Sequence, residues 1–395
     1  MNRPTGDERR NVGILAANQA LFLIAAITVM TLSGIVGQRL APTPALATLP
    51  IALMMVGVVL AALPASLLMK RVGRRTGFIV GALVGGAGGG ALSVWAITLD
   101  SFWLFCAGNL LLGLYQAFAN YHRFAAADAA SPAFESRAIS LVLAGGVVAA
   151  YLGPFNASRA NDLLAGLPDA GPYAVIVALA VLGAALHTRL RIPDDDEART
   201  GQQRSMREIR SDPASNVALL AATVGYTIMI LVMTATPLAM QQEGFGLPDA
   251  ATVMQWHVLG MFAPSFVTGH LIARFGLPTM LLAGAAVLVG SVVVAVAGQT
   301  VGHFLVSLLL VGVGWNFLFV GGSALLATTH APAERGKVQG ANELVIFSAV
   351  AVGSLLAGAL LHGVGWITLN LLMLPLVGAT AVVTWRWRQT RPSAR

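Results

Sequence analysis

The sequence predicts an all-α membrane protein with twelve transmembrane helices in two six-helix bundles. Of its 395 residues, 56% are hydrophobic and only 10% are charged, and the mean hydropathy is +0.76. A soluble domain carries about a quarter charged residues, so this chain lacks the polar surface that solubility requires. Apolar stretches of about 20 residues, the length that crosses a bilayer, follow one another along the chain.

Twelve such stretches are predicted, six in each half of the chain. The first half contributes residues 12–37, 45–69, 76–98, 102–126, 137–160 and 170–189. The second half contributes residues 215–240, 249–273, 277–298, 301–329, 337–361 and 364–385. The first stretch follows Arg9 and Arg10, as the apolar part of a signal peptide would. It is about twice as long as the apolar region of a signal peptide and lacks a convincing small-residue cleavage site, so we interpret it as a retained helix.

Lys and Arg gather in alternate loops between these stretches. They occur at the N-terminus (Arg3, Arg9, Arg10), in 70–75, at Arg137, in 189–210, at Arg274, at Arg335 and Lys337, and in 386–395. Cytoplasmic loops accumulate basic residues, so these loops and both termini are predicted to be cytoplasmic. The net charge of +7 then reflects topology, and no nucleic-acid partner is expected. The single cysteine excludes an internal disulfide and a four-cysteine zinc site.

A polar segment near the middle of the chain divides it into two halves. The predicted domains are an N-terminal bundle over 1–190, a cytoplasmic central loop over 191–214 and a C-terminal bundle over 215–395. The loop carries the acidic run 194–197 among arginines, a pattern typical of a solvated connection.

Two loops carry related signatures. The segment 66–75 ends in Lys70-Arg71-Val-Gly-Arg-Arg, and 269–276 reads Gly-His-Leu-Ile-Ala-Arg-Phe-Gly. Both resemble the G-x-L-a-D-R-x-G-R-R signature of the major facilitator superfamily. A second similarity between the halves is a spacing. Tyr115-Gln116 precedes Pro132 by the same number of residues as Trp315-Asn316 precedes Pro332. The resemblance covers the whole chain and implies two bundles that rock about a midplane site.

The first signature has lysine where the family has an acidic residue, and this change leads to a hypothesis about the gate. With Lys70 at that position, we expect Glu343, within the eleventh stretch, to pair with Lys70 or Arg71 and close the cytoplasmic side. Ionisable groups within a span are functional candidates. The fourth stretch carries His122 and Arg123, and Asp128 lies just beyond its end; these three are further gate or coupling candidates. Arg123 could pair with Asp128 or with Glu343, or these two carboxylates could carry a coupling proton.

Two pairs of soft side chains fall at helical spacing in the seventh and eighth stretches. Met229 and Met233 form one pair, and His257 and Met261 form the other. Spacing of four residues stacks each pair on one helix face, and the helical rise places all four about 18–27 Å from the cytoplasmic side. Thioether and imidazole are ligands that suit Cu(I), so the residues predict a copper site.

These two pairs resemble the motifs of the CcoA-like copper importers, a branch of the same superfamily, as does the segment 121–128. The resemblance implies a multi-pass protein of the bacterial inner membrane that imports copper for assembly of cbb3-type cytochrome oxidase. Met229, Met233, His257 and Met261 would then bind copper as substrate, with no cofactor, and a cytoplasmic copper acceptor is a further candidate partner. Riboflavin carriers share much of this branch.

Amides and aromatics on the first, fourth and tenth stretches support an alternative. These cavity candidates are Asn18, Gln19, Tyr115, Gln116, Asn120, Trp315 and Asn316. They suit an organic solute at least as well as a metal, as in a flavin importer or a drug exporter. A sensor or scaffold is less favoured because no large domain lies outside the bilayer. Without a Walker A loop or a catalytic triad, the chain is not expected to be an enzyme.

Overall fold

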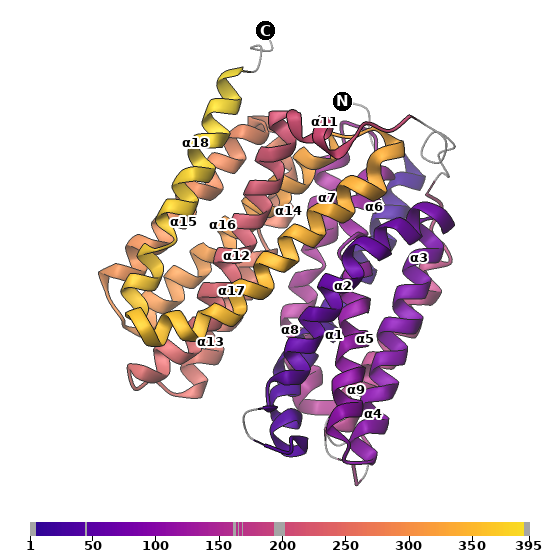
Figure 1. The fold of residues 1–395 in the computed structure, drawn as a ribbon, viewed down its shortest axis with the longest axis vertical. Coiled ribbons are helices and arrows are strands. Elements are labelled where there is room, and N and C mark those ends of the chain that lie inside the picture. The colour runs from indigo at the N-terminus through magenta and orange to yellow at the C-terminus, as the bar shows by residue number, and fades with distance from the viewer. Residues whose placement is uncertain are drawn as a thin grey trace.

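The computed structural model describes residues 5–43, 46–160, 163–164, 166–167, 169–192 and 202–390, and among them it contains helices and no strand. Two helical bundles lie side by side (Figure 1). Among the described residues, eleven helical segments are long and apolar enough to cross a membrane, and the last of these runs for 59 residues. Its backbone leaves the helix at Gly365, where φ is +76°, so it holds two spans and the predicted twelve are present.

The first bundle contains six spans, three of them divided. They are α1 (Gly6–Leu40); α2 (Leu49–Val72); α3 (Arg74–Val80), η2 (Gly81–Gly88) and α4 (Gly89–Thr98); α5 (Phe102–Ala119) and α6 (His122–Asp128); α7 (Glu135–Ala144) and α8 (Gly146–Arg159); and α9 (Ala170–His187). The segment η2 is a π-helix, a widened turn within the third span. Its glycines let other helices approach closely, because a Cβ on Gly85 would lie 2.5 Å from the Tyr115 backbone nitrogen.

The second bundle repeats this plan. A short helix, α11 (Met206–Ser211), precedes α12 (Pro213–Gln242); α13 (Leu247–Phe262) with α14 (Ser265–Phe275); α15 (Leu277–Ala297); α16 (Val301–Ala327); η4 (Pro332–Glu334) with α17 (Arg335–Leu371); and α18 (Leu374–Thr390). Pro264 stands where α13 gives way to α14. Of the predicted central loop, 193–201 with the acidic run 194–197 lies outside the described residues, as do Arg3 and 391–395.

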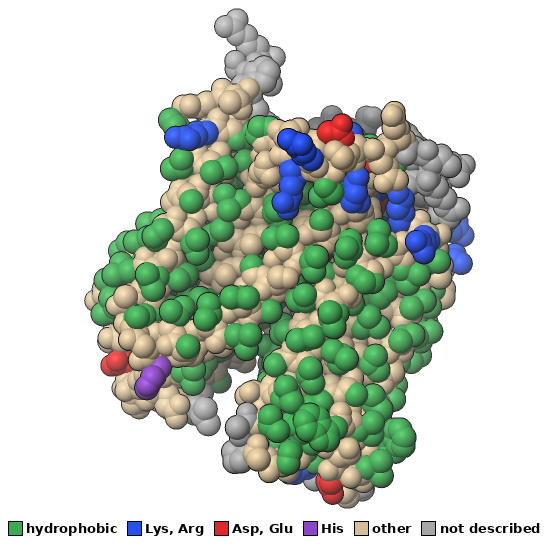
Figure 2. All heavy atoms as spheres, in the orientation of Figure 1, with side chains coloured by type: hydrophobic (Ala, Val, Ile, Leu, Met, Phe, Trp, Pro, Cys, Tyr) green, Lys and Arg blue, Asp and Glu red, His purple; other side chains and the backbone are tan. Residues whose placement is uncertain are grey.

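The start of α1 and the end of α18 lie at the same end of the molecule, called here the termini end (Figure 1). The two bundles converge there and spread apart toward the opposite, far end. Figure 2 shows the surface hollowed between the bundles at the far end, and most of the visible Lys and Arg side chains at the termini end. Helix α2 packs against α17, and α7 packs against α14, so these helices form the seam between the bundles.

Candidate functional site

A buried ion pair joins the two bundles. Arg123 on α6 donates to Glu343 on α17 over 2.6 Å, and their side chains are 3% and 1% exposed. Arg123 also donates to the Ser323 hydroxyl on α16 at 2.9 Å and to the Asn120 carbonyl at 2.6 Å. Every one of these partners fixes the guanidinium in place. Of the two pairings that the sequence left open for Arg123, the structure has the one with Glu343.

A second ionic group closes the termini end. Asp128 accepts from Arg74 in its own bundle at 2.9 Å and pairs with Arg335 of the other bundle at 3.2 Å. Arg74 also crosses the seam, where it donates to the Gln339 side chain at 2.5 Å. These contacts hold α3, α6 and α17 together at the termini end.

The expected gate contact between Glu343 and Lys70 or Arg71 is not found. Lys70 instead donates to the Ala333 backbone carbonyl at 2.9 Å, and Arg71 is exposed. The reason is position along the helices: Glu343 lies two turns deeper on α17 than the loop that Lys70 reaches, and there it meets Arg123. Lys70 still links the bundles, through a backbone group and not through a carboxylate.

An aromatic cluster in the second bundle lies against this ion pair. Trp315 stacks on Phe319 with ring centroids 5.0 Å apart, and Tyr226 on α12 meets both rings edge-on at 5.4 and 5.2 Å. Phe347 on α17 and Phe262 on α13 complete the cluster, at 5.5 Å from Tyr226 and 5.7 Å from Trp315. The Arg123 guanidinium lies 4.3 Å from the Phe319 ring centroid, a cation–π contact that connects the cluster to the ion pair.

Helical spacing builds this arrangement. On α16, Trp315, Phe319 and Ser323 recur every four residues, so one face of the helix carries two rings and then the hydroxyl that binds Arg123. On α17, Glu343 and Phe347 share a face in the same way. Sequence reasoning selected Trp315 and Glu343 but missed Tyr226, Phe319 and Phe347. The repeated spacing of an aromatic residue four positions from each selected residue is the signal that could have found the last two.

Several buried polar atoms beside the cluster have no hydrogen-bond partner within the described part of the chain. They are Trp315 Nε1, the hydroxyls of Thr223 and Thr227 on α12, Asn120 Nδ2 and Glu343 Oε2. Leaving a buried polar group unpaired costs about 1–3 kcal/mol. Together the rings and these polar atoms could hold a flat, partly polar organic molecule.

The remaining cavity candidates divide into two groups. Asn316 is fully buried and serves the fold: it donates to the Met261 carbonyl and the Ser265 hydroxyl and accepts from Thr268, which ties α16 to the junction of α13 and α14. In the first bundle, Tyr115 packs edge-on against Phe22, and Gln116 is half-buried. Asn18 is buried with an unpartnered Oδ1, and Gln19 contacts His122 at 3.0 Å.

The four predicted copper ligands lie on helices that both pack against α16. His257 is fully buried, and its Nδ1 lies 2.7 Å from the Leu308 carbonyl of α16. Met229 and Met261 are also buried, and Met233 is half-buried. The Nε2 of His257 is buried without a partner. Among the described residues, no group of three or more His, Cys, Asp or Glu side chains is placed to hold a metal.

Comparison with known proteins supplies the family. A family model described as Major Facilitator Superfamily matches residues 15–300 and 250–395. The chain is 41% identical over 377 residues to the riboflavin transporter RfnT of Brucella anthropi, covering 95% of this chain and 94% of the relative. It is 30% identical over 387 residues to the uncharacterized MFS-type transporter YdeG of Bacillus subtilis, covering 92% of this chain and 88% of the relative.

Solved structures agree with the fold. The human organic anion transporter MFSD10 (TETRAN) superposes with a TM-score of 0.79 at 16% identity, covering 96% of this chain and all of that one. The transporter FucP in its outward conformation superposes with a TM-score of 0.73 at 17% identity, covering 97% of this chain and 99% of that one. The relatives are transporters and not enzymes, as the sequence predicts, and the curated ones are bacterial. The chain therefore belongs to the Major Facilitator Superfamily of multi-pass membrane transporters.

Proposed function

We propose that this protein imports riboflavin or a closely related flavin by alternating access. The observation that carries the proposal is the aromatic cluster of Tyr226, Trp315, Phe319 and Phe347 with unpartnered polar atoms beside it. The relative named as a riboflavin transporter, similar over 95% of this chain, supports the same substrate class. This reading replaces copper import as the leading one.

Flavin chemistry matches such a site. The isoalloxazine system is flat and aromatic, and it can stack on or meet aromatic side chains edge-on. Its pyrimidine edge has both hydrogen-bond donors and acceptors, and the ribityl chain carries hydroxyls. Trp315 Nε1 and Asn120 Nδ2 can donate to carbonyl oxygens, and the hydroxyls of Thr223 and Thr227 can donate or accept.

The charge distribution supports the orientation that import requires. Basic residues concentrate at the termini end, and the positive-inside rule assigns that end to the cytoplasm. The far-end hollow then faces the outside, so the structure corresponds to an outward-facing carrier. Flavin would enter from the far end, and rocking of the bundles would separate Arg123 from Glu343 and open the path inward.

Copper import is the second candidate. Its support is the spacing of Met229, Met233, His257 and Met261, together with the buried His257 Nε2 that has no partner. An imidazole nitrogen without a partner is free to bind a soft metal. The resemblance to copper importers and the role in oxidase assembly belong to this candidate and stay predictions.

The test measures both cargoes with one set of proteoliposomes. We expect the wild type to take up radioactive riboflavin with saturable kinetics. In Trp315→Ala or Tyr226→Ala the apparent affinity for riboflavin should fall about tenfold, because the loss of one aromatic contact and hydrogen bond costs about 1.4 kcal/mol. Trp103→Ala is the matched control, because that ring is 63% exposed on the outer surface of α5.

Two outcomes would overturn the flavin proposal. One is wild-type vesicles that do not take up riboflavin. The other is uptake that Trp315→Ala and Trp103→Ala reduce equally. Radioactive copper uptake lost on substitution of Met229, Met233, His257 and Met261 by leucine would establish the second candidate, and normal copper uptake in those variants would dismiss it.

A further inference from the structure

The Arg123–Glu343 ion pair closes one side of the proposed flavin site, which is the aromatic cluster with the unpartnered polar atoms beside it. Helix α17 begins at the termini end, so Glu343 lies one turn nearer that end than Phe347. Helix α16 ends close to that start, so Ser323, which binds Arg123, lies one turn nearer the termini end than Phe319. A molecule that enters from the far end therefore meets the rings before the two charges.

The helices around the flavin site carry very few charged residues. Helices α5, α12 and α16 contain no Lys, Arg, Asp or Glu. The other charged residues of α6, α13 and α17 lie near the ends of those helices: Asp128, Asp249, Arg335 and Lys337. At the depth of the cluster these six helices thus contribute one cation, Arg123, and one anion, Glu343. The net charge of the site is zero.

This neutrality depends on Glu343. An arginine side chain stays protonated in proteins, so the charge of Arg123 is permanent. Its acceptors within the described residues are the Ser323 hydroxyl, the Asn120 carbonyl and the Glu343 carboxylate. Only the last of these carries a formal negative charge. Without that carboxylate, Arg123 would be a buried cation without a counter-charge, and such a cation attracts an anion.

A flavin and its phosphate ester differ chiefly in charge. Riboflavin is uncharged at neutral pH, whereas a phosphate monoester carries a charge of about −1.5 to −2. Burying that charge is costly unless a cation is there to pair with it. In this site the cation is already paired with Glu343, and the unpartnered Oε2 of Glu343 would repel the phosphate oxygens.

We propose that Arg123 and Glu343 form a charge filter that restricts the cargo to uncharged flavins and rejects riboflavin 5′-phosphate. The inference rests on the proposed flavin import and names the specificity of the same site. Glu343 acts through Arg123, because it cancels a charge that would otherwise bind the phosphate group. No covalent bond forms or breaks in this step.

Equilibrium binding to the purified protein tests the filter. The probes are riboflavin and riboflavin 5′-phosphate, and the readout is quenching of their fluorescence. We expect the wild type to bind riboflavin about a hundredfold more tightly than the phosphate ester, because the ester brings an unpaired charge into a buried site. Glu343→Gln should reverse this preference, since it leaves Arg123 free to pair with the phosphate. Equal affinities of the wild type for the two flavins overturn the proposal.

The matched control is the double variant Arg123→Gln, Glu343→Gln. It removes both charges and leaves the site neutral, so it should keep the wild-type preference for riboflavin. A purely structural role of Glu343 would weaken the binding of both flavins equally in Glu343→Gln. The preference would then be unchanged, and that result also overturns the proposal.

A second variant serves if Glu343→Gln does not fold. Thr227 lies on the same helix as Tyr226 of the cluster, and its buried hydroxyl has no partner among the described residues. Thr227→Lys therefore adds a cation to the site while both members of the ion pair remain. It should shift the preference toward the phosphate ester, and an unchanged preference counts against the filter.

Inorganic phosphate supplies an arm that needs no flavin. When phosphate replaces chloride at equal ionic strength, the melting temperature of Glu343→Gln should rise more than that of the double variant, because an anion that binds the folded state stabilises it. Equal shifts would show that Glu343 does not mask the Arg123 charge.

The two proposals fail in different ways. A wild type that binds riboflavin and its phosphate ester equally overturns the filter and leaves flavin import standing. A wild type that binds neither flavin overturns flavin import, and the phosphate melts still decide whether Glu343 masks the charge of Arg123.

Discussion

Arg123 and Glu343 form a 2.6 Å ion pair that joins the two bundles at a depth where neither side chain is more than 3% exposed. Phe124 and Phe319 flank the guanidinium at 4.4 and 4.3 Å. The pair therefore stabilises the closed termini end, and it must separate whenever that end opens.

Replacing Glu343 with glutamine should be strongly destabilising. The variant leaves the Arg123 charge buried without its counter-charge, a change that costs about 3–5 kcal/mol. The double variant Arg123→Gln, Glu343→Gln removes both charges. Its loss of stability should be smaller than the sum of the losses in the two single variants. Thermal unfolding in detergent measures all three.

The matched control for this cycle is Lys70→Gln with Glu343→Gln. Lys70 donates to the Ala333 carbonyl and does not contact Glu343. The stability losses caused by Lys70→Gln and by Glu343→Gln should therefore be additive. Strong coupling between Lys70 and Glu343, with none between Arg123 and Glu343, would contradict the structure and revive the gate expected from the sequence.

The number of spans and the location of both termini at the same end of the molecule could be predicted because they depend on local composition. Apolar length gave all twelve spans, and the boundary expected between 361 and 364 lies next to the break at Gly365. The interruptions of the helices within single spans could not be predicted from the sequence. The π-helix η2 and the break between α5 and α6 depend on which helices pack against them, and that packing is a tertiary property.

The candidate site shows the same limit. The sequence identified Arg123 and Glu343 as ionisable residues within spans, but 220 positions separate them and nothing local selects one partner over another. For the proposed copper ligands, spacing placed His257 and Met261 on one face. The rotation of that face about the helix axis is set by packing, and the His257 ring meets the Leu308 carbonyl of α16.

Arg335→Gln should loosen the seam at the termini end without unfolding the protein. It removes the pair with Asp128, whose partner Arg74 remains within the same bundle. The Arg335 side chain is 28% exposed, so we expect about 1 kcal/mol or a fivefold shift toward the open seam.

The reporter for this shift is Ser66→Cys with Cys106→Ser. Ser66 is 2% exposed, and its Cβ lies 3.1 Å from where a Cβ on Gly340 would be, so it reacts with a water-soluble maleimide only when α2 and α17 separate. Labelling should be faster in Arg335→Gln and unchanged in Arg210→Gln, which alters an exposed arginine at the same end. Equal labelling rates in the reporter protein and in its Arg335→Gln and Arg210→Gln variants would show that the ion pair of Arg335 with Asp128 does not hold the seam.

Gly113→Ala should destabilise the first bundle by at least the 1–3 kcal/mol typical of overpacking. Helices α2 and α5 cross so closely that a Cβ on Gly113 would lie 2.1 Å from the Met54 carbonyl oxygen, a backbone atom that cannot move aside alone. Gly358→Ala on α17 is the control, because no atom lies within 4 Å of its Cβ position. That substitution should be neutral or stabilising by up to about 1 kcal/mol, since alanine favours helix. The melting temperatures should move in opposite directions, and a tolerated Gly113→Ala would mean that the crossing is looser than the structure has it.

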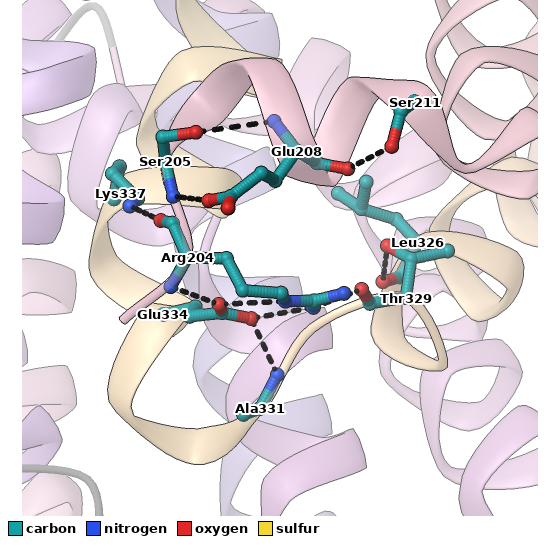
Figure 3. A network of polar contacts seen from close by, with 9 residues as sticks. All are labelled: Arg204, Ser205, Glu208, Ser211, Leu326, Thr329, Ala331, Glu334 and Lys337. Carbon is teal, nitrogen blue, oxygen red and sulfur yellow. Dashed lines mark hydrogen bonds and ion pairs between the residues drawn. The ribbon is translucent and has the colours of Figure 1, made fainter. Parts of the chain in front are cut away.

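The segment before α12 is fixed to the second bundle through Glu334 (Figure 3). The Glu334 carboxylate accepts from the Arg204 backbone and guanidinium and from the Ala331 backbone nitrogen. Hydrogen bonding by the Arg204 guanidinium lowers the pKa of Glu334 to about 2. Because this pKa lies below its ordinary value of 4.5, the contact contributes its full stability above that pH and loses it progressively as the pH falls from there through about 2.

Hydrogen exchange over 204–211 should therefore respond to mutation and not to mild acid. Glu334→Gln removes the charge that Arg204 binds, so amide exchange in α11 should become faster, while wild type corrected for the intrinsic pH effect should exchange alike at pH 7 and pH 5. Glu243→Gln, at an exposed side chain that accepts from Gln299 at the far end, is the control and should leave this segment unchanged. Release of the segment in wild type at pH 5 would mean that Glu334 titrates near the ordinary carboxylate range. The Arg204 pair would then be too weak to hold α11 against the bundle.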